Sequence, residues 1–327
     1  MKELHWAVLG TGVIANEMAQ ALHNMGRTLY GVCNRTYDKA VAFAEKYQVK
    51  KIYHSYEEMY QDASVDVIYI TTPHNTHYEF IRESLLHDKH VLAEKSITLN
   101  SRELNALKTL AEEKGLVLAE AMTIWHMPLY KKLWQIVKSG QIGRPQIITM
   151  NFGSFKDYDM TNRFFNMSLA GGAMLDIGVY ALSIVRSFMD ETPDQILSQM
   201  KPAPTGCDEQ AAVLLMNPSG QMATVALSMH SKQPKRAMIS CEKAYIEIME
   251  YPRADRAVIV DAATGEQTVI EAGETACALQ YELEDMETAI LTGDTSVMKL
   301  QESSDVMNIM TRLRTDWGLF YPEETNS

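Results

Sequence analysis

Short apolar runs alternate with amphipathic stretches between Leu4 and Leu118, and this alternation limits the possible folds. The apolar runs have the length of strands, and the stretches between them have helical periodicity. Strands that alternate with helices build a mostly parallel sheet with helices on both faces. The strands are predicted at 4–9, 28–33, 65–70, 90–93 and 116–118, and the helices at 14–25, 37–47, 76–87 and 101–114.

After Gly143 the pattern changes, and period-two alternation in several runs predicts a second, largely antiparallel sheet. The turn sequence Asn217-Pro218-Ser219-Gly220 is a strong hairpin connection, and residues 263–265 form a weaker one. The strands are predicted at 146–155, 195–200, 210–216, 222–230, 237–241, 245–249 and 257–260, and the helices at 128–139, 173–189, 279–291 and 297–319.

The 327 residues exceed the usual size of one hydrophobic core, so two domains are expected. We predict an α/β chain with a doubly wound Rossmann domain at 1–120. An α+β domain with an open, mostly antiparallel sheet follows at 121–327, and its last helix could pack back on the first domain.

The formal net charge of −12 gives no electrostatic reason to bind nucleic acid or an anionic membrane. The four cysteines lie far apart without a C-x-x-C pair, which argues against a zinc site and offers no disulfide framework. No apolar run approaches the 18 residues of a membrane span, and the N-terminus has no signal-peptide core. A cytoplasmic protein with a small-molecule substrate is expected.

A glycine-rich turn follows the first predicted strand and opens a helix: Gly10-Thr11-Gly12-Val13-Ile14-Ala15. In a G-x-G-x-x-A turn of this kind, the first glycine permits the tight turn and the second lets the backbone approach a pyrophosphate. The helix N-terminus attracts the phosphates. A lone match often marks an ordinary turn, but the strand–helix context favours dinucleotide binding.

The second strand ends at Cys33-Asn34-Arg35-Thr36, where an NAD-preferring site normally places an acid for the ribose 2′-hydroxyl. Arg35 instead offers a guanidinium that could pair with a 2′-phosphate, and Asn34 offers a further donor. The alternative is a solvated arginine at a helix start. The missing acid favours NADP, with NAD as the other possibility.

Three further segments sharpen the interpretation. They are 70–77 (Ile-Thr-Thr-Pro-His-Asn-Thr-His), 89–95 (Lys-His-Val-Leu-Ala-Glu-Lys) and 169–180 (Leu-Ala-Gly-Gly-Ala-Met-Leu-Asp-Ile-Gly-Val-Tyr). With the glycine turn and the Asp316-Trp317-Gly318 ending, they resemble the glucose-fructose oxidoreductase / inositol dehydrogenase / rhizopine-catabolism (Gfo/Idh/MocA) family across essentially the whole chain. The resemblance implies an NAD(P)-dependent dehydrogenase or reductase acting on CH–OH groups, and a homodimer or homotetramer formed through the second sheet.

The resemblance also implies roles for individual residues. Lys95 is the catalytic lysine, and Trp125 and His126 border the substrate. Asn162 and Arg163 could reach a polyol or an anionic group. A domain-interface role is an equal alternative for these four residues and for Glu120. The cofactor-binding residues, including those of the glycine turn and Arg35, are Gly10, Thr11, Gly12, Val13, Ile14, Asn34, Arg35, Thr71, Thr72, Pro73, His74, Asn75, His77, Glu94, Lys95 and Glu120.

Asp176 and Tyr180 are four residues apart on a predicted helix, so their side chains share one face. Many relatives carry histidine at the position of Tyr180. In having tyrosine there, the chain resembles the subgroup that contains dimeric dihydrodiol dehydrogenase. A phenol titrates near 10, and a nearby ammonium favours the phenolate. Tyr180 is therefore expected to exchange the substrate proton with help from Lys95, while Asp176 orients the site. Structural roles, as a core aromatic and a backbone-bound acid, are the alternatives.

Ser96 departs from the family's usual Glu-Lys-Pro sequence. Relatives often form a cis peptide with that proline, whereas a cis bond before serine costs about 2.5 to 4 kcal/mol. A trans or a strained Lys95–Ser96 bond is therefore expected. His74 and His77 have no neighbouring cysteines or acids, so no metal site is predicted.

The leading functional hypothesis is NADP-dependent hydride transfer involving a sugar, polyol or cyclic diol. A non-catalytic NAD(P)-binding sensor is the second hypothesis, and retention of Lys95 and Tyr180 argues against it. A glycosidase with tightly bound NAD is the third, and the apparent 2′-phosphate site disfavours it.

Overall fold

The computed structural model describes residues 3–325, which divide into two compact units. The first unit contains the chain up to Thr98, Arg102–Met122 and Ala276–Leu300. The second contains Leu99–Ser101, Thr123–Thr275 and the chain from Gln301. The sequence predicted a single domain boundary after residue 120. In the structure, Ala276–Leu300 also belongs to the first unit.

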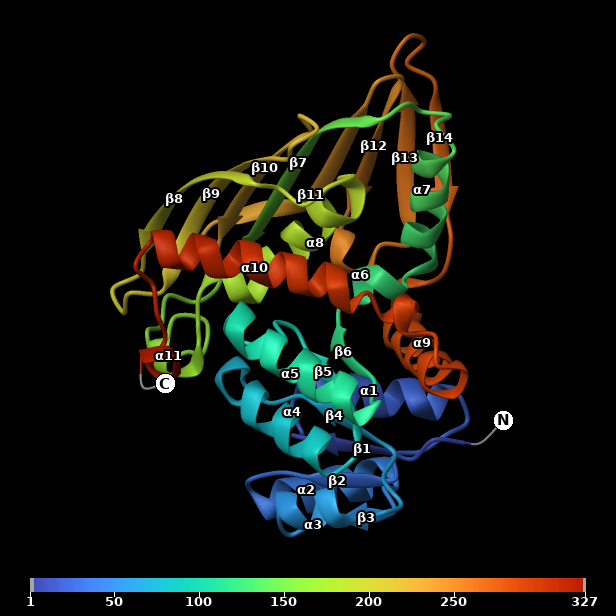
Figure 1. Ribbon diagram of the computed structural model, residues 1–327, viewed down its shortest axis with the longest axis vertical. Coiled ribbons are helices and arrows are strands. Elements are labelled where there is room, and N and C mark those ends of the chain that lie inside the picture. Colours follow the sequence, from blue (N-terminus) through green and yellow to red (C-terminus); the bar gives the residue numbers. More distant parts are fainter. Residues whose placement is uncertain (1–2, 326–327) are drawn as a thin grey trace. The chain divides into compact units, whose positions relative to one another are not determined.

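A six-stranded parallel sheet with the order β3-β2-β1-β4-β5-β6 forms the centre of the first unit, as Figure 1 shows in blue and cyan. This order and the alternation with helices confirm the predicted doubly wound fold. β4 reads Val-Ile-Tyr-Ile and is buried on both faces, as expected for a parallel strand with helices on either side. The strands are β1 (Trp6–Leu9), β2 (Gly31–Cys33), β3 (Lys51–Ile52), β4 (Val67–Ile70), β5 (His90–Glu94) and β6 (Leu118–Ala121).

Four long helices of this unit agree with the predicted ones, while several short elements were missed, among them β3 and α3. β3 has two residues and α3 six, which is too short for a periodic signal. The strand predicted at 116–118 begins two residues later, as β6. The helices are α1 (Val13–Asn24), α2 (Tyr37–Tyr47), α3 (Tyr56–Gln61), η1 (His74–Thr76), α4 (His77–Leu86), α5 (Ser101–Lys114), η5 (Thr275–Cys277), α9 (Ala278–Thr292) and η6 (Thr295–Met298).

Helix α9 belongs to the first unit, where its Glu287 forms hydrogen bonds with Trp6 and Arg27. The Glu287 carboxylate accepts a hydrogen bond from the indole of Trp6 at 2.8 Å. It also pairs with both terminal nitrogens of Arg27, at 2.9 and 2.6 Å. This bidentate pair explains how residues far from the N-terminus in sequence join the parallel sheet.

An eight-stranded sheet with the order β14-β13-β12-β11-β7-β10-β9-β8 forms the second unit. Its pairings are antiparallel except that of β7 with β10, which confirms the predicted open, mostly antiparallel sheet. The hairpin predicted at 217–220 is present, with the Asn217 N–H donating to the Gln221 carbonyl. The strands are β7 (Pro145–Ser154), β8 (Gln195–Pro202), β9 (Asp208–Met216), β10 (Met222–Ser228), β11 (Lys232–Cys241), β12 (Ala244–Met249), β13 (Arg256–Asp261) and β14 (Gln267–Glu271).

Two strands of this sheet differ from the prediction for identifiable reasons. β14 was missed because it is a largely exposed edge strand without a core-facing pattern. β11 starts five residues earlier than predicted because its first half contains Pro234, where the pairing register shifts. Proline lacks the amide N–H that a strand ladder needs, so the sequence pattern stopped short of it.

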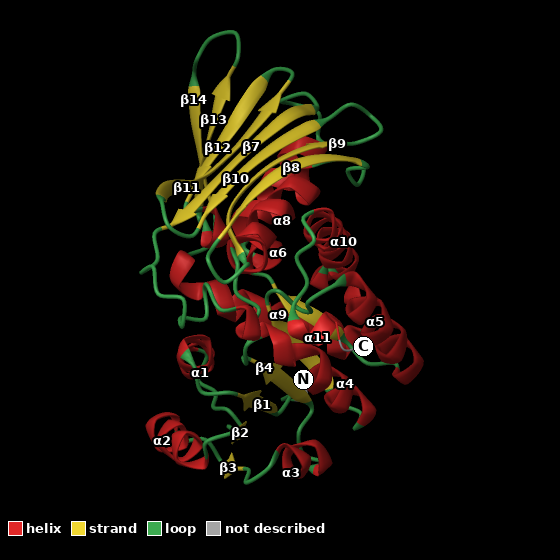
Figure 2. Cartoon of the chain, turned by 90° about the vertical axis from the view of Figure 1, so that its left-hand side faces the viewer, coloured by secondary structure: helices red, strands yellow, loops and turns green. Residues whose placement is uncertain are grey.

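The two faces of the second sheet differ in what covers them. Helix α8 (Val179–Phe188) contacts β7, β10 and β11 on one face. No helix among residues 3–325 covers the opposite face, which is visible in Figure 2. Strand register places one row of residues across that open face, from Leu197 through Leu214, Thr224, Thr149, Met238, Glu247 and Val258 to Val269.

The predicted helix at 297–319 is two elements, because Lys299 adopts a left-handed backbone with φ of 55°. The first is η6, and the second is α10 (Leu300–Asp316). The remaining helices are α6 (Thr123–His126), α7 (Pro128–Lys138), η2 (Met167–Leu169), a π turn at Met174–Gly178, η4 (Tyr251–Arg253) and α11 (Pro322–Thr325).

The expectation that no apolar run has the length of a membrane span needs correction. The helical stretch Met167–Phe188 has the required length and hydropathy, despite its Asp176 and Arg186. However, 78% of its most apolar window is buried inside the protein, as in a core helix.

Candidate functional site

The glycine turn lies at the carboxyl end of β1, where ligands of open α/β sheets bind. Gly10 has φ of +105°, and a Cβ built on it would lie 2.6 Å from Thr71 Oγ1. Thr71 Oγ1 donates to the Leu9 carbonyl at 3.0 Å, so that hydroxyl is held in place. The first glycine is thus required by the packing of β1 against the chain after β4.

Gly12 differs from Gly10 because a Cβ built on it would meet no heavy atom of residues 3–325 within 4 Å. It precedes α1, whose first turn has neither a side-chain cap bond nor an acidic residue. The Asn16 side chain donates to the Gly12 carbonyl at 2.8 Å and fixes the turn. Thr11 and Ile14 are partly exposed, and Val13 is 79% exposed. Open space above uncapped helix N–H groups fits a pyrophosphate.

The chain after β2 contains the residues predicted to bind the 2′ position of the ribose. Arg35 is exposed, and Asn34 donates its side-chain amide to the Thr36 carbonyl at 3.0 Å. Burial raises the pKa of the preceding Cys33 thiol to about 11, so this thiol stays protonated at neutral pH. The guanidinium of Arg35 is therefore the charged group offered at the end of β2.

The segment 71–77 follows β4, and its two histidines form hydrogen bonds with the backbone after β5. The His74 ring nitrogen Nε2 lies 3.0 Å from the Lys95 carbonyl oxygen. The ring of His77, fully buried, lies 3.0 Å from the Ser96 carbonyl through Nδ1 and 2.8 Å from the Thr72 carbonyl through Nε2. Both histidines thus bind backbone around Lys95. Pro73 is exposed and Asn75 is half-buried in the same segment.

Lys95 follows β5 at the same edge of the sheet as the glycine turn, where it is half-buried. Glu94 accepts a hydrogen bond from the Tyr69 hydroxyl, and buried Glu120 accepts one from the Ile97 N–H at 3.1 Å. Glu120 and the two histidines therefore bind the backbone on either side of Lys95. The side chains predicted to bind the cofactor all lie on the loops at this edge or beside them.

The expectation of a trans Lys95–Ser96 bond is wrong, because this peptide bond is cis. Serine carries no preference for that geometry, so the sequence at this position could not indicate it. The histidine contacts that hold the two flanking carbonyls come from the segment after β4.

The second unit carries the other predicted catalytic residues on the helix after Gly171 and Gly172. Asp176 lies in the π turn and Tyr180 in the first turn of α8. Single π turns are frequent at functional sites. Tyr180 is half-buried, with its ring 6.4 Å from that of Phe152. Asp176 is 9% exposed, and its Oδ1 lies 3.7 Å from an Arg163 guanidinium nitrogen.

Arg163 is the exposed member of the predicted substrate contacts, and it lies over the Phe164 ring. Asn162 uses its side-chain oxygen to accept from the Phe164 N–H at 3.3 Å. Trp125 and His126 are buried in α6, where the Trp125 indole donates to Ser303 at 3.4 Å. The structure thus brings Arg163 to Asp176, and it places Trp125 and His126 in packed surroundings.

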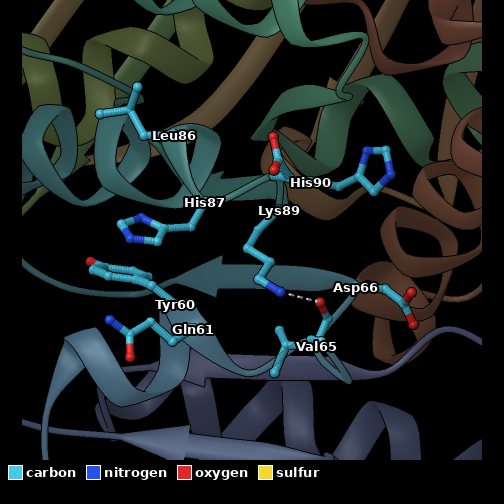
Figure 3. A pocket seen from close by; sticks show the side chains of 10 residues that line it. Tyr60, Gln61, Val65, Asp66, Leu86, His87, Lys89 and His90 are labelled. Carbon is cyan, nitrogen blue, oxygen red and sulfur yellow. Dashed lines mark hydrogen bonds between the residues drawn. The ribbon is translucent and has the colours of Figure 1, made fainter.

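A hollow of about 530 Å³ lies at the opposite, amino-terminal edge of the parallel sheet, as Figure 3 shows. Lys89 crosses it and donates to the carbonyls of Asp62 and Val65, at 2.7 and 3.0 Å. Burial lowers the pKa of Lys89. This ammonium serves to hold the chain before β4, and the hollow is separate from the glycine turn.

Comparisons with known proteins agree with this geometry. Residues 4–122 match the model of the Gfo/Idh/MocA oxidoreductase family with its NAD-binding Rossmann fold. Residues 130–247 match the C-terminal domain of the same family.

Among curated proteins, the chain is similar to trans-1,2-dihydrobenzene-1,2-diol dehydrogenases. The protein of Xenopus laevis is 27% identical over 97% of this chain and 99% of its own. The protein of Mus musculus is 27% identical over 98% of this chain and 99% of its own length.

Solved structures share the fold. A 3-ketoreductase from Actinomadura kijaniata, in complex with NADP and TDP-benzene, has a TM-score of 0.86 at 21% identity, covering 96% of this chain and 98% of its own. UDP-N-acetylglucosamine 3-dehydrogenase from Acidithiobacillus ferrooxidans has a TM-score of 0.82 at 20% identity, with the same coverage.

Proposed function

Because the chain belongs to the Gfo/Idh/MocA family of oxidoreductases, we propose that it transfers hydride between NADP and a cyclic diol, sugar or polyol. The glycine turn is the observation that supports NADP binding. Gly10 packs against Thr71, while Gly12 leaves open space before an uncapped helix. The full-length similarity to diol dehydrogenases makes a trans-dihydrodiol the first substrate to test.

The nicotinamide, when bound, accepts or supplies the hydride. Tyr180 would take the hydroxyl proton as the substrate alcohol becomes a carbonyl, and would return it in the reverse direction. Lys95, the catalytic lysine by family resemblance, would assist that proton transfer. Asp176 would bind a substrate hydroxyl, with its carboxylate oriented by Arg163.

Arg35 is proposed to select NADP by pairing with the 2′-phosphate. Arg35→Ala should weaken NADPH binding by about 10- to 100-fold, since a charge-assisted bond contributes roughly 1.5 to 3 kcal/mol. NADH affinity should stay unchanged. Fluorescence titration of both cofactors measures the effect.

Arg82→Ala provides the matched control, because Arg82 is a surface arginine of α4 paired with Glu83. It should alter neither affinity. If wild-type protein binds NADH as tightly as NADPH, or if Arg35→Ala has no effect, the assignment of Arg35 fails.

We also propose that the open face of the second sheet associates with a second copy of the chain. Leu197 is 69% exposed at one end of its row and Val269 is 46% exposed at the other, which is unusual for a sheet that faces water. Leu197→Glu should shift the mass measured by light scattering to that of a monomer. A wild-type protein that is already monomeric at micromolar concentration would contradict the proposal.

A further inference from the structure

A buried carboxylate lies directly behind the glycine pair that precedes Asp176 and Tyr180. Asp208 is the first residue of β9 and is 1% exposed. Its Oδ2 accepts a hydrogen bond from the Met174 N–H at 2.5 Å, at the first residue of the π turn. A Cβ built on Gly172 would lie 2.0 Å from Asp208 Oδ1, so this carboxylate is packed against the glycine backbone.

The C-terminal segment reaches the same glycine pair from another element. The buried hydroxyl of Tyr321 donates to the Gly171 carbonyl at 2.8 Å. The Arg314 guanidinium lies 4.8 Å from the centre of the Tyr321 ring and pairs with both oxygens of Glu324, at 2.8 and 3.0 Å. Asp208 and Tyr321 thus hold the two ends of a short backbone segment, residues 171–174.

We propose that Asp208 is a positioning residue, which sets where the π turn begins and thereby how Asp176 and Tyr180 are presented to the substrate. The bonded amide belongs to Met174, two residues before Asp176. The backbone amide of Ala173, the residue before the turn, also hydrogen-bonds to this carboxyl, so Asp208 holds two successive amides where the π turn begins. The inference rests on the proposed function, because it assigns Asp208 a role through Tyr180.

The protonation state of Asp208 is expected to matter near neutrality. Burial raises the pKa of Asp208 to about 7, against the lowering effect of the Met174 N–H and of Arg314. The other titratable groups that act on this carboxyl, or are acted on by it, are Tyr321 and Cys207, and Glu324 is paired with Arg314. The charged carboxylate is the stronger acceptor for the Met174 N–H, so the turn is held more firmly as the pH rises through 7.

Asp208→Asn is the direct test, because the amide keeps an oxygen for Met174 but cannot ionise. With NADP and trans-1,2-dihydrobenzene-1,2-diol as the probe, kcat should fall about 10- to 100-fold, as expected for small misplacement of reacting groups. The NADPH dissociation constant should stay within about twofold, because that site lies on the first unit. The wild-type to variant ratio of kcat should increase from pH 6 to pH 8.

A second measurement does not depend on turnover. Hydrogen exchange of the amides of residues 172–178, followed by mass spectrometry on the full chain, should be faster in Asp208→Asn than in wild type. Asp261→Asn is the matched control, because Asp261 also accepts from backbone N–H groups, at the exposed turn after β13. It should change neither exchange at 172–178 nor kcat.

Unchanged exchange at 172–178, or a kcat ratio that does not vary with pH, would overturn the role of Asp208. Absence of turnover by the wild-type protein would instead refute the proposed function. The exchange rates then still decide whether Asp208 sets the π turn.

Discussion

Lys95→Met is expected to lower kcat by about 10²- to 10⁴-fold, the usual contribution of positioned acid–base chemistry. Methionine is close in length to lysine but cannot stabilise a phenolate. The backbone around Lys95 is held by His74, His77 and Glu120, so the loop should keep its shape in the variant. NADPH affinity should therefore change little, and the loss should appear in kcat.

Tyr180→Phe should produce a loss of similar size, and the double variant should be little worse than either single variant. Residues that act as a unit in one proton transfer are strongly non-additive. Lys50→Met serves as the matched control, because Lys50 is an exposed lysine of the first unit. Full turnover by Lys95→Met and Tyr180→Phe would refute the mechanism.

Gly10→Ala is expected to lower stability, whereas Gly12→Ala is expected to weaken cofactor binding without a loss of stability. In Gly10→Ala the new methyl would meet Thr71 Oγ1 at 2.6 Å, and φ of +105° is unfavourable for alanine. Thr71 cannot turn away without losing its bond to the Leu9 carbonyl. A loss of about 1 to 3 kcal/mol in the free energy of unfolding is expected, with a lower Tm in thermal melts.

Gly12→Ala should leave the Tm unchanged, because its methyl would have no neighbour within 4 Å in the part of the chain that the structure describes. It should nevertheless weaken NADPH binding by about tenfold or more, since the methyl would fill the space that a pyrophosphate approaches. Calorimetric titration of both variants separates the two effects. Undiminished binding by Gly12→Ala would show that the phosphates lie elsewhere.

The sequence predicted well the features that depend on neighbouring residues. The turn at 10–15, the alternation that builds the parallel sheet and the hairpin at 217–220 each have a local cause, and the fold they predict is confirmed. Elements without a local pattern were missed, such as the exposed edge strand β14 and the two-residue β3. Burial and pairing define those elements, and neither can be read from a few residues.

The hydrogen bonds that hold the candidate site in place join segments far apart in the sequence. They could therefore not be predicted from it. His77 is far in sequence from Ser96, and nothing near either residue indicates that they bond. Asp208 precedes an ordinary strand pattern, yet its carboxylate reaches the turn that leads to Tyr180. The cis bond after Lys95 belongs to the same class. The sequence thus predicts which residues act, and the structure shows which contacts hold their backbone.

The proposed oxidoreductase activity is tested most directly by asking whether the purified chain reduces NADP with a hydroxylated substrate. Trans-1,2-dihydrobenzene-1,2-diol, aldoses and inositols should be supplied separately with NADP, and NADPH followed by its fluorescence. We expect NADPH formation with at least one of them, and its loss in Lys95→Met and in Tyr180→Phe. Tight NADPH binding with no NADPH formed from any of the three classes would contradict the proposed activity and favour a nucleotide sensor.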